Sequence, residues 1–139
     1  MQIVIDTNVF ISALRSQNGA SYKLFMLLGC GKFEINISVP LVLEYEDAAK
    51  RLLGEIALNE EDINTIINYV CAVGKRRKIF YLWRPVLRDP KDEMLLELAV
   101  AGGCDYIVTY NTADFAEIEQ FGIQAIKPSM LLKKIGETE

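Results

Sequence analysis

The sequence predicts a three-layer α/β/α sandwich with a mainly parallel central sheet. Short apolar segments with strand character alternate with longer segments whose apolar residues recur at helical spacing. The chain has 139 residues, of which 51% are hydrophobic and 24% charged, with no repeat or linker-like tract. That is enough for one domain with a real core and too little for two. We therefore expect a single domain over residues 1–139.

The four expected strands differ in pattern. The runs IVI at 3–5 and YIV within 106–109 are continuously apolar, which predicts central strands covered on both faces. The segment FEINIS at 33–38 alternates and predicts an edge or half-covered strand, and a further strand is expected at 124–127. Ligands of parallel sheets collect at the carboxyl ends of the strands, where Asp6 and the residues after 108 are expected to meet.

The helices are expected where apolar residues follow the 3.6-residue period. One follows the first strand, and a short segment near 79–82 precedes the helix that starts after Pro90. Glycines after several of these segments are typical of helix ends. The further expected helices cover 20–28, 41–53, 60–73, 91–101 and 129–135.

Composition excludes several classes of chemistry. Without histidine the chain cannot use a Ser-His-Asp or Cys-His nucleophile, and most catalytic zinc sites are excluded. Cys30, Cys71 and Cys104 have no CxxC spacing and are expected to be small buried hydrophobes in a reducing compartment. A net charge of −4 argues against binding nucleic acid through bulk positive charge. The sequence shows no membrane span or signal peptide, so we expect a cytoplasmic protein.

Asp6 stops the first apolar run where a helix is expected to begin. Taken alone, this position suits a helix cap better than a metal ligand. Beside three further acids it becomes the best candidate for a central metal carboxylate, which leaves Thr7 and Asn8 to cap the helix.

Two of these acids fall on helix faces that are expected to be buried. Glu44 lies at the apolar face of 41–53, where the alternatives are a lysine partner or a position at the rim facing water. Asp92 begins the apolar stripe of 91–101, although an acid in a first turn is also favoured by the helix dipole. Asp89 is the expected cap of this helix, and Glu93 faces elsewhere and suits the dipole.

The fourth acid is Asp114, in the sequence YIVTYNTADF just beyond a buried strand. The alternative is an ordinary first-turn acid in a short helix capped by Asn111 or Thr112. Several acids that converge without a histidine or a matched cationic partner would repel one another, and a divalent cation relieves that repulsion. Oxygen-only ligands favour Mg²⁺ or Mn²⁺, which implies phosphoryl transfer with a metal-activated water.

These segments resemble the PIN-domain nucleases in the same order along the chain. The likeness rests on IVIDTNVFISAL, PLVLEYEDAAKRLL, DPKDEMLLELAVAGGCDYIVT and NTADF. It covers nearly the whole chain and is weakest between about 54 and 86. Within that family the chain looks most like the bacterial and archaeal toxin–antitoxin branch related to VapC-type toxins. The resemblance implies a PIN-like fold, Mg²⁺- or Mn²⁺-dependent cleavage of single-stranded or structured RNA, a small antitoxin partner and homodimerisation.

The resemblance also implies roles for single residues. Asp6, Glu44 and Asp92 would be catalytic metal ligands, and Asp114 would take the fourth acidic position. Many relatives carry an aspartate where this chain has Asn111, so a neutral side chain removes one charge there. Asn8, Thr109 and Asn111 would orient these ligands or a water.

The most basic and aromatic stretch is a candidate RNA surface. It combines cations for phosphate contacts with Tyr81 and Trp83 for base stacking. The alternatives are an exposed basic connector and a contact for an antitoxin. The candidate cations are Lys75, Arg76, Arg77, Lys78, Arg84 and Arg88.

Two other functions stay open from the sequence. A catalytically weak or inactive PIN module that binds RNA or protein is suggested by the neutral Asn111. A Mg²⁺-dependent phosphatase also carries an aspartate after its first strand, but its DxD pair is absent because Asn8 stands at the second acidic position.

Overall fold

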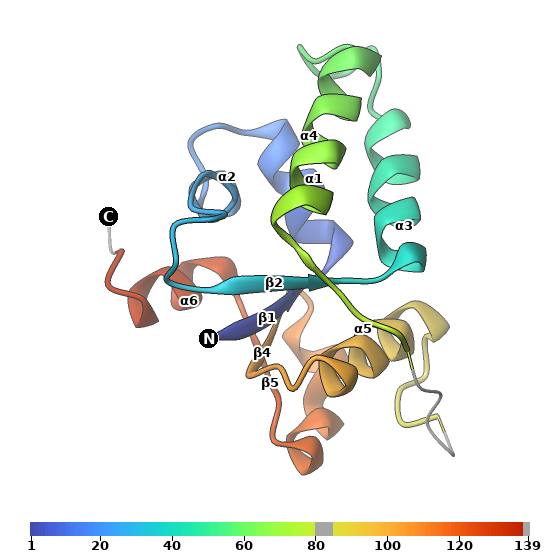
Figure 1. Ribbon diagram of the computed structural model, residues 1–139, viewed down its shortest axis with the longest axis vertical. Helices are drawn as coiled ribbons and strands as arrows, with labels where there is room; N and C mark the ends of the chain where they lie inside the picture. The colour runs from blue at the N-terminus through green and yellow to red at the C-terminus, as the bar shows by residue number, and fades with distance from the viewer. Residues whose placement is uncertain (80–84, 138–139) are drawn as a thin grey trace.

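The computed structural model describes residues 1–79 and 85–137, which fold around a five-stranded sheet (Figure 1). The strand order is β3-β2-β1-β4-β5, and every neighbouring pair is parallel. The predicted α/β class with a parallel sheet is therefore confirmed. The strands are β1 (Gln2–Ile5), β2 (Glu34–Ile37), β3 (Lys75–Arg76), β4 (Tyr106–Val108) and β5 (Gln124–Ile126).

Helices cover both faces of this sheet. In Figure 1, α1, α2, α3 and α4 lie on one side, α5 and the 3₁₀ helix η1 lie on the other, and α6 packs against α2. Each expected helix is present, with ends shifted by a few residues. The helices are α1 (Thr7–Arg15), α2 (Ala20–Met26), α3 (Val39–Lys50), α4 (Glu60–Val73), α5 (Pro90–Ala101), η1 (Thr112–Phe121) and α6 (Pro128–Lys134).

The centre of the core is the pair β1–β4, as the continuous apolar runs predict. Ile3 pairs with Tyr106 and Ile5 with Val108, so the two strands end side by side. The apolar residues of β1 are almost fully buried, and α5 covers one face of the sheet with a cluster of leucines. This pairing places the residues after Ile5 and Val108 at the same edge of the sheet.

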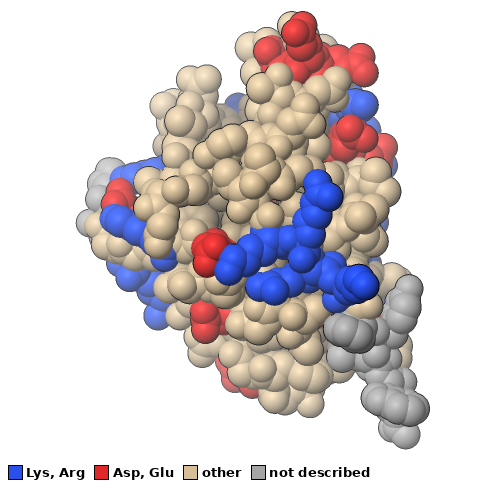
Figure 2. Space-filling model, viewed as in Figure 1, with Lys and Arg blue, Asp and Glu red and all other residues tan. Residues whose placement is uncertain are grey.

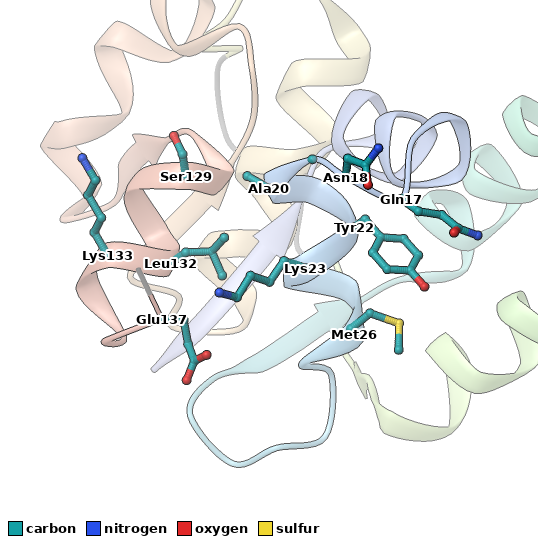
Figure 3. A pocket seen from close by; sticks show the side chains of 11 residues that line it. Gln17, Asn18, Ala20, Tyr22, Lys23, Met26, Ser129, Leu132, Lys133 and Glu137 are labelled. Atoms are coloured by element: carbon teal, nitrogen blue, oxygen red, sulfur yellow. The ribbon is translucent and has the colours of Figure 1, made fainter. Parts of the chain in front are cut away.

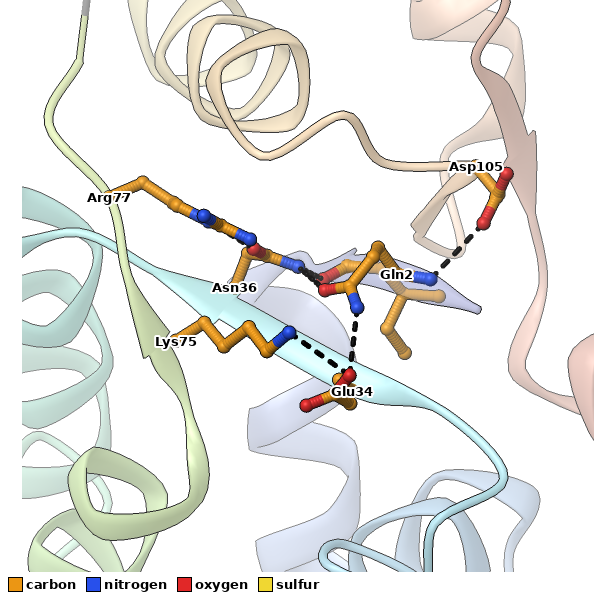
Figure 4. A network of polar contacts seen from close by, with 7 residues as sticks. Gln2, Glu34, Asn36, Lys75, Arg77 and Asp105 are labelled. Atoms are coloured by element: carbon orange, nitrogen blue, oxygen red, sulfur yellow. Dashed lines mark hydrogen bonds and ion pairs between the residues drawn. The ribbon is translucent and has the colours of Figure 1, made fainter.

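The prediction that 33–38 forms an edge or half-covered strand is wrong. β3 pairs with the outer side of β2, and Asn36 in β2 is completely buried. Its amide Nδ2 donates to the Gln2 side chain at 2.9 Å and to the Ile3 carbonyl at 3.3 Å, so a polar residue is satisfied inside the sheet (Figure 4). The polar residue in the middle of FEINIS is therefore a buried, hydrogen-bonded asparagine and does not indicate a face of the strand exposed to solvent. Most of the segment expected near 79–82 lies outside the described residues.

The cysteines follow their prediction in part, because Cys104 is buried and Cys71 half-buried, whereas Cys30 is exposed. Burial raises the pKa of the Cys104 thiol to about 12, so this group stays protonated. None of the helices in residues 1–79 and 85–137 is long and apolar enough to cross a membrane.

Candidate metal centre

Asp6 occupies the cap position of α1, but its side chain does not cap the helix. The backbone leaves β1 in an extended conformation, and the Asp6 amide donates to the Val108 carbonyl at 2.9 Å. The carboxylate Oδ2 accepts a hydrogen bond of 2.8 Å from the hydroxyl of Thr109, the residue that follows the neighbouring strand β4. The sequence leaves open whether Asp6 is a helix cap or a metal ligand, and in the structure its side chain makes no capping hydrogen bond.

Thr109 is the centre of a small polar group behind Asp6. It is completely buried, and its hydroxyl oxygen accepts from the Asn111 amide at 3.0 Å and from Asn8 Nδ2 at 3.4 Å. Asn8 Oδ1 accepts in turn from the Tyr110 amide at 3.4 Å. These contacts hold the Asp6 carboxylate in one orientation. The side chain of Asn111 is exposed, and its described contact here is through the backbone.

The expectation that Thr7 and Asn8 cap α1 is wrong. No side chain makes a capping hydrogen bond at this helix start, and Thr7 Oγ1 is buried without a hydrogen-bond partner. Asn8 is turned toward Thr109 instead. The side chains of Asp6 and Asn8 thus bridge the strand ends, whereas that of Thr7 does neither.

Glu44 reaches the same region from α3, whose start is set by Ser38 and Pro40. The Ser38 hydroxyl accepts from the Leu41 amide at 3.3 Å, and Pro40 lies in the first turn. Glu44 is half-buried, as its place on the apolar face predicts, and Lys91 Nζ lies 3.6 Å from its Oε1. The lysine-partner alternative therefore holds in this structure.

Tyr45 is a residue that sequence reasoning missed. Its ring is buried against Phe10, with 4.9 Å between ring centroids, and its hydroxyl donates to the Ile5 carbonyl, one residue before Asp6. Burial raises the pKa of the Tyr45 hydroxyl well above its ordinary value, and the charges of Asp6 and Glu44 add to the rise. Tyr45 thus ties α3 to the end of β1 and fixes Glu44 beside Asp6.

Asp92 is brought to the site by the first turn of α5. Asp89 caps this helix, as predicted, by accepting from the Lys91 amide at 2.9 Å, and Pro90 follows it. Glu93 has more than a dipole role: its Oε1 accepts from the amides of Val86 and Leu87 at 2.9 and 2.8 Å. This second missed residue holds the segment that leads into α5.

Asp114 lies in the first turn of η1, where its side chain is exposed. Asp92, Asp114 and Arg88 line one cavity of about 440 Å³ between the start of α5 and η1. Leu87 and Ala113 also line this cavity, so its surface is partly apolar. A larger cavity of about 760 Å³ between α2 and α6 holds none of the four acids, and polar side chains such as Lys23 and Lys133 surround it (Figure 3).

The four predicted acids influence one another electrostatically. Burial raises the pKa of Asp92 to about 6, and the negative charges of Asp89, Asp6, Asp114 and Glu44 contribute in that order. Burial also raises the pKa of Asp6; the hydrogen bond from Thr109 and the neighbouring amides oppose this rise, and the charge of Glu44 adds to it. The four acids, which lie on separate elements of the chain, are therefore close enough in the fold to affect one another's pKa values.

The donor set fits a hydrated Mg²⁺ or Mn²⁺ ion. Within residues 1–79 and 85–137, no three acidic or cysteine side chains converge tightly enough to enclose an ion by themselves. Mg²⁺ usually keeps several waters and takes only one or two carboxylates directly, so a loose set of four carboxylates suits it. Burial raises the pKa of Asp92, and the charges of the neighbouring acids add to that rise, so a bound divalent ion would stabilise the ionised carboxylate.

The raised pKa of Asp92 predicts a pH-dependent effect on stability. Because the folded state favours protonated Asp92, this group's stabilising contribution is complete below its ordinary pKa of 3.8 and is lost as pH rises through about 6. In EDTA, D92N should therefore be more stable than the wild type near pH 7 by about 1 kcal/mol, after allowance for solvent screening. The advantage should disappear near pH 4. Urea unfolding across this range measures it, and a pH-independent difference would contradict the shift.

The predicted RNA-contacting cations fall into two groups. Lys75 lies 3.1 Å from Glu34, and Arg77 Nε donates to Asn36 Oδ1 at 2.7 Å, so both belong to a polar network at β1 and β2 (Figure 4). Arg76, Lys78 and Arg88 are exposed. Basic side chains form a band over the face that carries β2 and β3 (Figure 2). Arg84, Tyr81 and Trp83 lie outside the described residues.

Comparison with known proteins gives a family match. A family model described as PIN domain matches residues 2–113, a range that contains Asp6, Glu44 and Asp92 and ends one residue before Asp114. The sequence has no match among curated proteins.

Solved structures with a similar fold include two described as VapBC. One is a crystal structure of VapBC2 from Rickettsia felis bound to a DNA fragment from their promoter, with a TM-score of 0.60 and 15% identity over 90% of this chain and 98% of that chain. The other, VapBC-1 from nontypeable Haemophilus influenzae, has a TM-score of 0.59 and 14% identity over 92% of this chain and 98% of that chain. At these identities the likeness shows the fold.

Proposed function

The chain belongs to the PIN-domain family of nucleases, and we propose that it is a divalent-metal-dependent endoribonuclease, the toxin of a toxin–antitoxin pair. We place this activity in one domain spanning residues 1–139. The observation that carries the proposal is the set of four carboxylates around the carboxyl ends of β1 and β4. The pKa of one of them, Asp92, is raised by burial first and then by the charges of Asp89 and of the other three acids.

The residues of the site divide the work as follows. Asp6, Glu44, Asp92 and Asp114 would hold Mg²⁺ or Mn²⁺, which when bound supplies an activated water and stabilises charge on the scissile phosphate. Thr109 and Asn8 keep the Asp6 carboxylate oriented, and Asn111 contributes its amide to Thr109.

The exposed cations beside the site support a nucleic acid as the substrate. Arg88 lines the cavity that contains Asp92 and Asp114, and Arg76 and Lys78 extend the basic surface from the edge of the sheet. Such cations suit phosphates of a single-stranded or structured RNA, and the partly apolar cavity suits a base or ribose next to the cleaved bond.

An apolar groove supports the proposal of a partner protein. It has a volume of about 840 Å³, lies between α1, α2 and α4, and is lined by side chains including Phe10, Leu14, Phe25 and Ile66. Met26 and Tyr69 expose large apolar surface beside it. We propose that an apolar segment of an antitoxin covers this surface, an expectation based on the likeness to VapBC structures. We also propose that the protein forms a homodimer and acts in the cytoplasm.

The proposed function predicts RNA cleavage that depends on a divalent ion. We expect purified protein to cut single-stranded or structured RNA with Mg²⁺ or Mn²⁺ and to leave it intact in EDTA, because the acids need the ion to act on a phosphodiester. Gel analysis of labelled RNA measures this. Cleavage that persists in EDTA would contradict the metal mechanism. Mn²⁺ binding without cleavage would favour an inactive RNA- or protein-binding module, and turnover of small phosphate esters without RNA cleavage would favour a phosphatase.

A further inference from the structure

Lys91 extends from α5 to Glu44 on α3. Its backbone amide is fixed by Asp89 at the helix start, and its side chain extends so that Nζ lies 3.6 Å from Glu44 Oε1. The Glu44 side chain is 22% exposed, whereas that of Lys91 is 70% exposed. Lys91 is therefore anchored at its backbone and free to move at its charged end.

The surroundings of this ion pair are unusually negative. Asp92 is the next residue along the helix, Asp89 lies two residues before Lys91, and both carboxylates line the same cavity. Among the ion pairs of the described residues, Lys91–Glu44 is the one that involves a proposed metal ligand. Within the described residues, Lys91 thus forms an ion pair with Glu44 and with none of the other three acids.

We propose that Lys91 is an exchangeable counter-ion of this centre, paired with Glu44 in the metal-free protein and transferred to a substrate phosphate when a divalent ion binds the acids. The inference rests on the proposed function. A lysine and a metal ion compete for the same carboxylate, because each neutralises the charge of Glu44.

The net charge of the site explains why the released lysine would contact the substrate phosphate. One divalent ion does not neutralise four carboxylates, and an RNA phosphate brings a further negative charge to the same place. A cation at the rim of the site lowers the repulsion that the phosphate meets. Lys91 is in the first turn of α5, between Asp89 and Asp92, which both line the cavity of Arg88. Its flexible side chain therefore extends at the rim of the proposed site, where we place its contact with the phosphate.

The test measures metal binding and cleavage separately. Calorimetric titration of Mn²⁺ into K91M, without RNA, should give a Kd about two- to fivefold lower than that of the wild type, since the competing charge is gone. At saturating Mn²⁺, kcat/KM for RNA should fall about tenfold because a charged phosphate contact is lost. K91R, which keeps the charge, should stay close to the wild type in both measurements.

K133M is the matched control, because Lys133 is exposed in the last turn of α6, away from the four acids. It should change neither quantity, and thermal unfolding should show that every variant is folded. Unchanged or weaker Mn²⁺ binding by K91M, or unchanged kcat/KM, overturns the exchange while the proposed function stands. A wild type that binds no Mn²⁺ overturns the metal centre, and the exchange with it.

Discussion

Replacing Asp6 with asparagine is expected to reduce RNA cleavage by about three orders of magnitude, equivalent to about 4 kcal/mol of transition-state stabilisation. The D6N variant loses the carboxylate that lies between Glu44 and Thr109, but its amide oxygen can still accept the Thr109 hydrogen bond. Initial rates on labelled RNA at saturating Mn²⁺ measure the loss.

The same substitution separates a metal ligand from a structural residue. Burial and the charge of Glu44 disfavour ionised Asp6, so D6N should unfold at the same temperature as the wild type or a higher one when EDTA is present. D47N is the matched control, because Asp47 is an exposed acid of α3 paired with Arg51, and it should keep full activity. A folded D6N protein with wild-type cleavage would refute the assignment of Asp6.

Replacing Glu93 with alanine is expected to lower the free energy of unfolding by about 3 kcal/mol. The carboxylate accepts hydrogen bonds from the amides of Val86 and Leu87, and each charge-assisted bond contributes roughly 1.5–3 kcal/mol, with some of the loss recovered by water. The E93A variant also frees the segment that leads to Asp89 and Asp92, so cleavage should fall even where the protein is folded. Urea unfolding at neutral pH gives the stability change.

Two further variants decide how Glu93 acts. E93Q keeps an oxygen that can accept from both amides and should recover much of the stability, although it lacks the charge. E119A removes an exposed glutamate of η1 and should leave stability within about 0.5 kcal/mol. If E93A were as stable as E119A, the anchoring of the 86–87 segment by Glu93 would be wrong.

The positions of Asp6, Glu44 and the helix cap Asp89 can be predicted from the sequence because each follows a local pattern. Asp6 ends a continuous apolar run, and β1 and β4 do pair so that it meets Thr109. Glu44 falls on the buried side of α3 because helical spacing assigns it to that face, and Asp89 is the helix cap that its place before Pro90 indicates. Local patterns of this kind are set by the nearest few residues of the chain.

The contacts that hold these acids in place could not be predicted from the sequence. The Tyr45 hydroxyl meets a carbonyl 40 residues away, and an apolar-face tyrosine predicts burial without naming its partner. The sequence predicts Glu93 only as a first-turn acid and indicates no role for Lys91, because the partners of both side chains depend on how α5 lies against α3 and the preceding loop. Tertiary contacts of this sort follow from the packing of whole elements rather than from spacing.

The edge of the sheet shows the same limit. β3 consists of two basic residues within KRRK, too short for any period to reveal, and without it β2 was assigned to the edge. Asn36 then looked like the solvent-facing position of an alternating strand, whereas its amide is enclosed by Gln2, Ile3 and Arg77.

The brevity and charge of β3 have a consequence for how the protein behaves at high concentration. An edge strand offers unpaired backbone groups to other chains, and long, flat, uncharged edges lead to aggregation. Here one edge is two residues long and carries Lys75 and Arg76, and the other, β5, is three residues long and is followed by Lys127 and Pro128. Repulsion between the basic side chains of β3 in two molecules, and the lack of an N–H at Pro128 beyond β5, both oppose hydrogen bonding between the edge strands of different molecules. These features protect a small parallel sheet from assembling into fibrils.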